Sequence, residues 1–434
     1  MLTVVVLDII LLVALLMMSL PLPACFAGAM MFMVAFGGVP MDSMLLWDFQ
    51  QSTGSVLLAS PLFILAGTYM GGSGVAKRLL DLADAFVGHI KGGLGVVSII
   101  TCAVIGAISG SGFTGIAATG PIMIPRMVEQ GYSRGYATAL VTVSSVLGLL
   151  IPPSVVMVMF GWVTESSILA CFLSTLGPGL AITFLFCLIN MVWSRKFDLK
   201  LIEKLPPRER SLNIAKRTYS AVPALMMPLI ILGGIYGGLF TPTEAAAVSA
   251  FYSIPVGLFI YKAIKTKDVI SMTKEACSSI GSIMVMIICC LMLSQALVFL
   301  RVPEMIVEMF FSLTSNKAIM LIIINLFLFV VGMIVNDTTG VLLCAPLLLP
   351  IMQRLGVSTI HFAAIMGVNL AMGGITPPYA SILYLGMRVG KCEFAEILKP
   401  TMVFLLIGYV PIVFLTTFWP DLALFIPRIC GYAV

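Results

Sequence analysis

Two short polar clusters are the parts of this sequence best suited to binding a small cation. The first is Ser109-Gly110-Ser111-Gly112 and the second is Asn336-Asp337-Thr338-Thr339-Gly340. Their hydroxyl, amide, carboxylate and main-chain oxygens are hard ligands, which small hard cations prefer. Each cluster lies between two apolar segments, so the sequence predicts two re-entrant helical hairpins with polar tips inside a membrane. We place Asp337 near the middle of that membrane, where acidic side chains are usually functional.

A double proline interrupts the apolar stretch that follows each hairpin. The prolines are Pro152-Pro153 after the first hairpin and Pro377-Pro378 after the second. Proline removes a backbone donor and breaks the helical ladder, and freed carbonyl groups at membrane depth persist only where they line a cavity or bind something. The oxygens of a hairpin tip and a broken helix would together form a dehydrated cage suited to Na⁺. Half-helix N-termini at the same place would attract an anionic substrate.

The two hairpins and their broken helices belong to an internal repeat. The offset of 225 that carries Gly148 onto Gly373 also carries Pro152-Pro153 onto Pro377-Pro378, without gaps over almost fifty residues. The candidate ion and substrate residues of the first repeat are Ser109, Gly110, Ser111, Thr114, Ser144, Ser145, Gly148, Pro152 and Pro153. Those of the second repeat are Asn336, Asp337, Thr338, Thr339, Asn369, Gly373, Thr376 and Pro377.

The composition requires that these elements lie in a membrane. Of 434 residues, 60% are hydrophobic and 10% are charged, whereas soluble domains carry roughly 25% charged residues. Apolar stretches such as Ile168–Trp193 and Pro223–Phe240 approach or exceed the ~20 residues that a spanning helix needs. The sequence therefore predicts an all-α polytopic membrane protein and excludes a soluble enzyme.

Loop charge predicts the orientation. Eight basic and three acidic residues lie in Ser194–Arg217, and four more basic residues lie in Tyr261–Lys274. Because cytoplasmic loops are enriched in Lys and Arg, both segments should be cytoplasmic. The first hairpin then enters from the cytoplasm and the second from the opposite side, so the repeats have inverted topology, an architecture common in secondary transporters.

This topology divides the chain into six parts. We expect N-terminal scaffold spans at 1–55, the first repeat at 56–193, a basic cytoplasmic loop at 194–219, further scaffold spans at 220–261, a second cytoplasmic loop at 262–275 and the second repeat at 276–434. The first repeat contains an amphipathic arm helix, a hairpin at 92–128, a broken helix at 135–162 and a closing span, and the second contains a hairpin at 318–352, a broken helix at 361–386 and a closing span.

Other chemistries have little support. The ten cysteines are scattered without a C-x-x-C pair, and the two histidines, His89 and His361, are expected at the membrane interfaces. Metal, haem, disulfide and membrane-enzyme readings are therefore disfavoured, and no cofactor is expected besides Na⁺ as coupling ion. The dinucleotide pattern that begins at Gly110 lacks a strand before it. Asp8 is expected to extend toward an interface, and the basic loops are orientation signals without the groove that nucleic acid requires.

Several motifs resemble the large membrane subunit of tripartite ATP-independent periplasmic (TRAP) transporters. They are Pro61–Gly67, Gly106–Gly112, Ile124–Tyr132, Ile151–Ser154, Phe240–Ala247 and Asn369–Pro378, spread over essentially the whole chain. The resemblance implies a Na⁺-driven importer of organic acids in the bacterial inner membrane, with an elevator-like movement of the hairpins against a scaffold. It also implies three kinds of partner besides membrane lipid: a separate small four-span membrane subunit, a periplasmic substrate-binding protein and the organic acid.

One departure from the family motif and one alternative function remain open. Relatives often carry Ala-Asp after the first Ser-Gly-Ser, where this chain has Phe113-Thr114-Gly115, so the side-chain ligands of the first ion site are not fixed by the resemblance. The alternative function is a stand-alone Na⁺/carboxylate symporter of related elevator fold that needs no binding protein.

Overall fold

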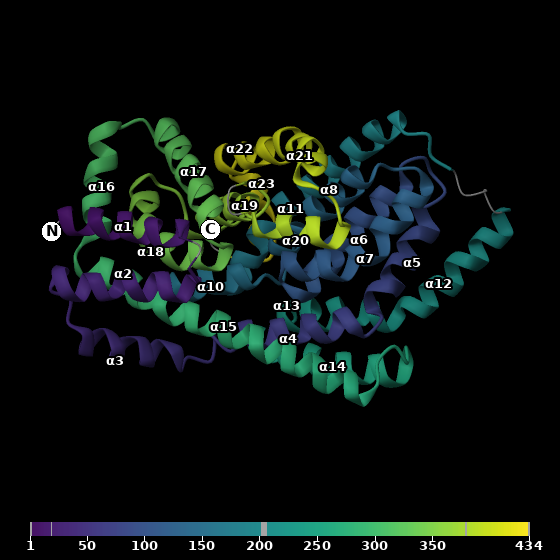
Figure 1. Ribbon diagram of the computed structural model, residues 1–434, viewed down its shortest axis with the longest axis horizontal. Coiled ribbons are helices and arrows are strands. Elements are labelled where there is room, and N and C mark those ends of the chain that lie inside the picture. The colour runs from purple at the N-terminus through teal and green to yellow at the C-terminus, as the bar shows by residue number, and fades with distance from the viewer. Residues whose placement is uncertain (1, 19, 201–205, 378–379, 433–434) are drawn as a thin grey trace.

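The computed structural model describes residues 2–18, 20–200, 206–377 and 380–432 (Figure 1). Within these ranges the chain is helical and contains no strand. Seven of the described helical segments are long and apolar enough to cross a membrane, namely Arg134–Val163, Ile168–Lys196, Arg208–Tyr236, Pro242–Ile260, Thr266–Phe299, Lys317–Ile334 and Phe394–Phe418. The prediction of an all-α multi-pass membrane protein is therefore confirmed.

The two repeats contain matching helices in the same order. The first consists of α4 (Ala59–Gly72), α5 (Val75–Val87), α6 (Gly93–Ser109), α7 (Gly112–Gln130), α8 (Arg134–Ser145), α9 (Leu147–Leu150), α10 (Val155–Val163) and α11 (Ile168–Trp193). The second consists of α15 (Thr266–Phe299), α16 (Val302–Leu313), α17 (Lys317–Ile334), α18 (Asp337–Arg354), α19 (Thr359–Gly373), α20 (Ser381–Gly390), α21 (Phe394–Val403), the π-helical η4 (Phe404–Tyr409) and α22 (Val410–Phe418).

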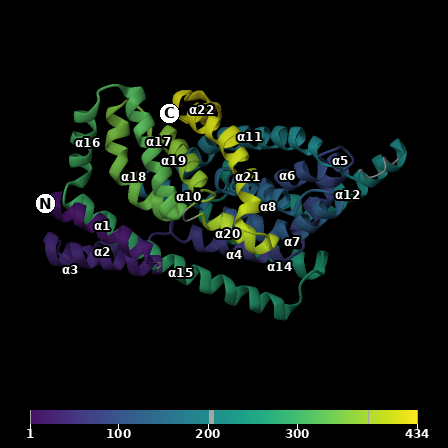
Figure 2. The same cartoon turned by 45° about the horizontal axis from the view of Figure 1, so that its top comes forward.

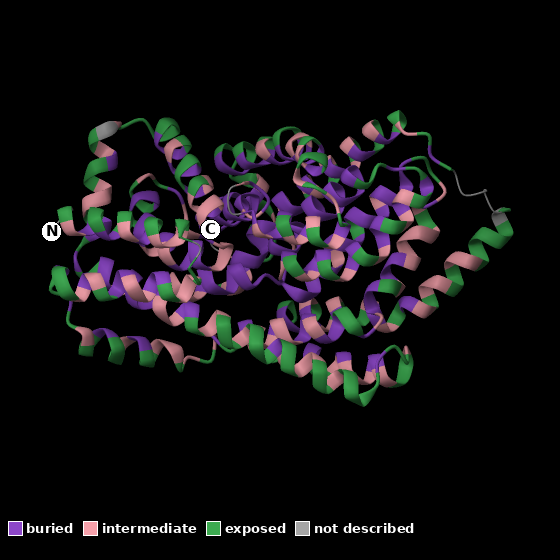
Figure 3. Ribbon diagram, in the orientation of Figure 1, coloured by how far each residue is buried: buried purple, intermediate pink, exposed green. Residues whose placement is uncertain are grey.

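The remaining helices flank the repeats. They are α1 (Leu2–Met17), α2 (Leu22–Gly37), α3 (Met41–Ser52), the short 3₁₀ turn η1 (Ser194–Lys196), α12 (Pro207–Pro228), η2 (Leu229–Gly233), α13 (Gly234–Tyr236), α14 (Pro242–Pro255), η3 (Val256–Ile260) and α23 (Asp421–Ile429). Figure 3 shows that buried residues gather in the centre of the molecule, on α8, α10 and α19, whereas α3 and α12 are largely exposed. The broken helices therefore form the core.

The two hairpins begin and end at opposite ends of the molecule. The base of the first lies beside the 194–200 segment, since the Lys200 amide donates to the Gln130 carbonyl at 2.9 Å and the Asn190 amide donates to the Gly92 carbonyl at 2.9 Å. The base of the second lies at the other end of α11, where Ser358 and Ser167 line one cavity. The 26 residues of α11 separate these ends by about 39 Å. The repeats are therefore inverted.

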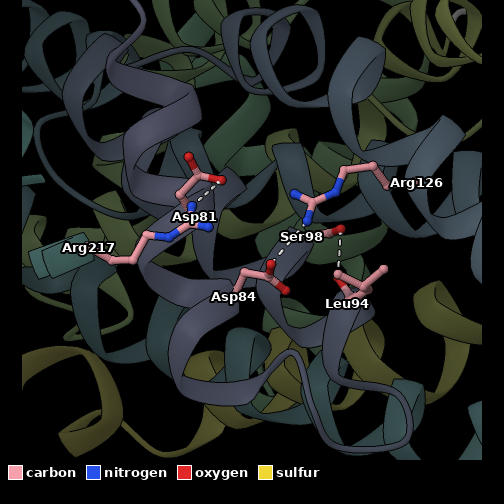
Figure 4. Close-up of polar contacts among 6 residues, drawn as sticks. All are labelled: Asp81, Asp84, Leu94, Ser98, Arg126 and Arg217. Atoms are coloured by element: carbon pink, nitrogen blue, oxygen red, sulfur yellow. Dashed lines mark hydrogen bonds and ion pairs between the residues drawn. The ribbon is translucent and has the colours of Figure 1, made fainter. Parts of the chain in front are cut away.

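The amphipathic arm helix α5 is joined by ion pairs to two other helices (Figure 4). Asp84 pairs with Arg126 of α7 at 3.0 Å, and Asp81 pairs with Arg217 of α12 at 2.9 Å. The opposite face of α5 buries Leu79 and Leu80. The arm thus connects the base of the first hairpin to the flanking helix α12.

Packing by neighbouring helices buries three ionisable side chains. Asp8 is only 1% exposed, because it lies on the face of α1 that packs inward with Val5 and Leu12, so its side chain does not extend to the surface as expected. His361 follows Ser358 at the base of the second hairpin and is 4% exposed; its Nε2 lies 2.7 Å from the Thr416 carbonyl, so it is a packing residue. Asp48 on α3 is buried as well.

Candidate functional site

The tip of the first hairpin packs against the break in its own repeat. Gly110 takes a left-handed conformation, with φ of 64°, and its carbonyl accepts a hydrogen bond of 3.4 Å from the Val155 amide at the start of α10. A Cβ added at Gly110 would lie 3.1 Å from the Pro153 carbonyl oxygen. The Ser109 hydroxyl donates to the Gly106 and Ser111 carbonyls at 3.5 and 3.4 Å. The structure therefore brings the predicted residues from 109 to 111 together with the break at 151–154.

The tip of the second hairpin is anchored by a helix cap and by α15. The Asn336 side chain accepts from the Thr339 amide at 2.8 Å, which caps α18. Its amide group and the Thr339 hydroxyl lie 3.5 and 3.2 Å from the Met286 sulfur. Asp337 is the first residue of α18 and is partly exposed. A carboxylate there is stabilised by the positive end of the helix dipole.

The hairpins approach their broken helices through pairs of glycines. A Cβ added at Gly148 would lie 2.5 Å from the Gly106 Cα, and one added at Gly373 would lie 2.5 Å from the Gly332 Cα. Carbon atoms normally pack at about 3.5–4.0 Å, so neither contact leaves room for a side chain. Gly148 and Gly373 were predicted site residues, but their partners Gly106 and Gly332 were not assigned a role in the site.

Each hairpin also packs on the broken helix of the other repeat. Helix α7 contacts α20, and α18 contacts α10; α7 and α20 lie side by side in Figures 1 and 2. At the first of these contacts, a Cβ on Gly112 would lie 2.9 Å from the Ile382 side chain. The hairpins and broken helices of the two repeats therefore pack against one another, as in transporters of inverted topology.

Two equivalent positions in the broken helices hold buried oxygen atoms without hydrogen-bond partners. They are Ser144 Oγ and Asn369 Oδ1, which the offset of 225 relates, and both residues are fully buried. Ser154 Oγ, in the first break, is also unpartnered. A buried polar atom left unsatisfied costs about 1–3 kcal/mol, so these atoms are available to a ligand.

Other predicted residues already have partners. The Ser145 hydroxyl donates to the Thr142 carbonyl at 2.7 Å, and the Thr376 hydroxyl donates to the Met372 carbonyl at 2.9 Å. Thr114 points toward α4, where its Oγ1 would lie 3.5 Å from a Cβ on Gly67. Helix-internal bonds of this kind satisfy carbonyls that the breaks would otherwise leave free.

The double prolines separate the two halves of each broken helix. Pro152 and Pro153 lie between α9 and α10 and are joined by a cis peptide bond. Pro377 follows α19 and is partly exposed, whereas Pro378 lies outside the described residues. The remaining candidate, Thr338, is partly exposed on the first turn of α18.

The second repeat contains a series of hydrogen-bonded polar side chains that the sequence analysis did not predict. The Asn369 amide donates to Asn325 Oδ1 of α17 at 2.6 Å, and the Asn325 amide donates to Thr417 Oγ1 of α22 at 2.9 Å. Asn325 is the only strongly polar residue within the apolar run 318–335, which is a signal that could have revealed it. These hydrogen bonds fix the hairpin, the broken helix and the closing span relative to one another.

A related contact occurs in the first repeat. The Tyr136 hydroxyl donates to Asn190 Oδ1 on α11 at 3.1 Å. The offset of 225 relates Tyr136 to His361, and both bind the closing span of their repeat. Tyr136 and His361 therefore position the broken helices and do not line the site.

The inverted repeats and their broken helices define an integral membrane protein with the architecture common in secondary transporters. Among the described residues, no group of three or more His, Cys, Asp and Glu side chains could hold a metal ion. The family model for the "Tripartite ATP-independent periplasmic transporter, DctM component" matches residues 9–422. The chain belongs to this family.

Several relatives are similar over most of the chain. The C4-dicarboxylate TRAP transporter large permease protein DctM of Pseudomonas aeruginosa is 33% identical over 88% of this chain and 88% of its own length. The sialic acid TRAP transporter large permease protein SiaM of Vibrio cholerae is 31% identical over 88% and 90%. The isethionate TRAP transporter permease protein DctMQ of Oleidesulfovibrio alaskensis is 34% identical over 90% of this chain, which spans 61% of that longer protein.

A solved structure shares the fold. The YdaH transporter of Alcanivorax borkumensis superposes with a TM-score of 0.58 at 15% identity, covering 89% of this chain and 91% of that one. At this level of identity the likeness supports the fold alone.

Proposed function

We propose that this chain is the translocating subunit of a Na⁺-coupled importer of organic acids in the bacterial inner membrane. The observation that carries the proposal is the equivalent pair of buried, unpartnered oxygens on Ser144 and Asn369, each one turn before the glycine that contacts a hairpin. Two such sites, one in each repeat, would each hold a dehydrated Na⁺ among main-chain and side-chain oxygens.

The organic acid would bind between the tips, where several helices begin. Helices α7, α10, α18 and α20 all start at a tip or after a break, and their first amide groups are positive ends that attract a carboxylate. The names of the similar large permeases support this class, since they refer to C4-dicarboxylates and sialic acid. Na⁺ bound close by would add positive charge and couple the two binding events.

Two protein partners complete the transporter. A separate small four-span membrane subunit would pack against the flanking helices, and a periplasmic binding protein would deliver the substrate. In the elevator movement proposed here, the hairpins and broken helices shift against α1–α3 and α12–α14, with the arm helix α5 between them.

Na⁺ binding can be tested without knowledge of the substrate. The purified chain in detergent is melted in NaCl and in KCl at equal ionic strength. A ligand that binds only the folded state at 100 times its Kd stabilises it by about 2.7 kcal/mol, so the NaCl sample should melt higher. Ser144→Ala and Asn369→Ala should each reduce the difference between the two salts.

Two buried serines away from the tips are matched controls. Ser249 and Ser253 on α14 each donate to a carbonyl of their own helix. Ser249→Ala and Ser253→Ala can lower both melting temperatures but should preserve the difference between the salts. Equal melting of the parent in both salts, or an unchanged salt difference in both site variants, would contradict the proposed ion sites.

The transport reaction itself needs reconstitution. Proteoliposomes that contain this chain and a small subunit should accumulate organic acid only with a Na⁺ gradient and an added binding protein. Uptake by the chain alone, without the binding protein, would instead identify a stand-alone symporter.

A further inference from the structure

An apolar groove opens on the outer surface between the closing spans of the two repeats. It has a volume of about 650 Å³ and runs along α11 and the α21–η4 segment. Its walls are Leu188, Ile189, Val192, Trp193, Val403 and Ile407, and its mouth holds Lys196 and Lys399. Phe186 and Phe404 pack edge to face beneath it, with ring centroids 5.4 Å apart.

The spacing of the lining residues places both lysines at the same end of the groove. Lys196 is the last of the lining residues contributed by α11 and the turn after it, whereas Lys399 is the first of those contributed by α21–η4. Lys196 lies eight positions after Leu188, and Ile407 lies eight positions after Lys399, a rise of about 12 Å on each wall. The groove is therefore apolar over this length and cationic at one mouth.

That mouth lies at the end of the molecule with the basic 194–200 segment. Lys196 Nζ lies 5.5 Å above the Trp193 ring, a cation–π contact of the kind found where aromatic residues meet a membrane interface. Neither lysine belongs to an ion pair within the described part of the chain. The nearest acids on α21, Glu393 and Glu396, are used in the cap of that helix.

We propose that this groove is a binding site for an anionic phospholipid. One acyl chain would lie along Leu188, Val192 and Ile407, which are 49–59% exposed. The headgroup phosphate would lie between the two lysines. Basic pockets between spanning helices favour acidic headgroups in this way, and a zwitterionic lipid would gain less from the two cations. The site is independent of the ion and substrate sites.

Lipid binding can be measured by native mass spectrometry on the full chain. Phosphatidylglycerol and phosphatidylethanolamine with identical acyl chains serve as probes. We expect phosphatidylglycerol to bind more tightly, and Lys196→Gln and Lys399→Gln to weaken it about fivefold each. The matched control Lys262→Gln/Lys267→Gln removes two cations from another loop and should leave the affinity unchanged.

Two further measurements distinguish binding of the lipid headgroup from binding of its acyl chain. Leu188→Trp fills the groove while both lysines remain, and it should also weaken phosphatidylglycerol binding. Soluble glycerol phosphate should not displace the lipid, because it lacks the acyl chain; displacement would indicate a free phosphate site. Equal affinity for the two lipids, or retention of phosphatidylglycerol by the double lysine variant, would overturn the proposal. A cross-link from Ile407→Cys to the small subunit would assign the groove to that protein instead.

Discussion

Replacement of the glycines that join each hairpin to its broken helix is the sharpest test of the site geometry. In Gly148→Ala the new methyl group would lie 2.5 Å from the Gly106 Cα, and in Gly373→Ala it would lie 2.5 Å from the Gly332 Cα. Since carbon atoms pack at about 3.5–4.0 Å, the two helices must separate by about 1 Å. Overpacking of this size typically costs about 1–3 kcal/mol.

The separation should affect ion binding as well as stability. Ser144 and Asn369 lie four residues before these glycines, on the adjacent helical turn, so a shift of about 1 Å alters the oxygen positions that would hold Na⁺. We expect both variants to melt below the parent in KCl and to lose most of the additional stabilisation in NaCl. Because a protein of this size does not unfold in two states, the comparison uses the order of melting temperatures.

Gly281→Ala is the matched control. Gly281 lies on the exposed face of α15, and no atom lies within 4 Å of a Cβ placed there. Alanine is favoured over glycine within a helix by about 0.5–1 kcal/mol, so this variant should be at least as stable as the parent. If Gly148→Ala and Gly373→Ala melt like Gly281→Ala and keep their response to Na⁺, the glycine contacts do not position the ion sites.

Three further outcomes are expected. Asp337→Asn should insert and fold but weaken the dependence on Na⁺, because a charged carboxylate near the second tip costs several kcal/mol unless an ion or helix dipole offsets it; a normal Na⁺ titration would make the residue only a cap. A double-mutant cycle on Asp84 and Arg126 should give a coupling of about 0.5–1 kcal/mol, since Arg126 is 35% exposed and screening is substantial; zero coupling would remove this ion pair as a link between the arm and the first hairpin. In a background without exposed native cysteines, a membrane-impermeant thiol reagent outside the cell should label Glu165→Cys and not Lys200→Cys, and the reverse would overturn the orientation. Lys204, in the same basic segment as Lys200, lies outside the described residues.

Much of the fold could be predicted because its signals are local in the sequence. The length of apolar segments requires membrane spans, and the double proline Pro152-Pro153 marks a place where a helix is interrupted. The gap-free offset of 225 revealed the duplication, and the positions of the basic loops indicated that the second copy is inverted relative to the first. None of these inferences requires knowledge of which helices touch.

The role of individual polar residues depended on the tertiary structure. Ser144 and Ser145 are adjacent and identical in type, but only the Ser144 hydroxyl lacks a partner, because the other donates to its own helix. Asp8 was expected to extend toward an interface because it lies near one end of its span, whereas packing by neighbouring helices buries it.

The sequence by itself determined that this chain spans a membrane as two inverted repeats with polar tips and broken helices, because hydropathy, charge and proline act on the segment that contains them. Only the tertiary structure decided that α7 packs on α20 and α18 on α10, that glycine pairs close each hairpin, and that Asn325 bonds Asn369. A contact between distant segments depends on which face each helix turns toward its neighbour. That choice is made by the packing of all the helices together and not by any one of them.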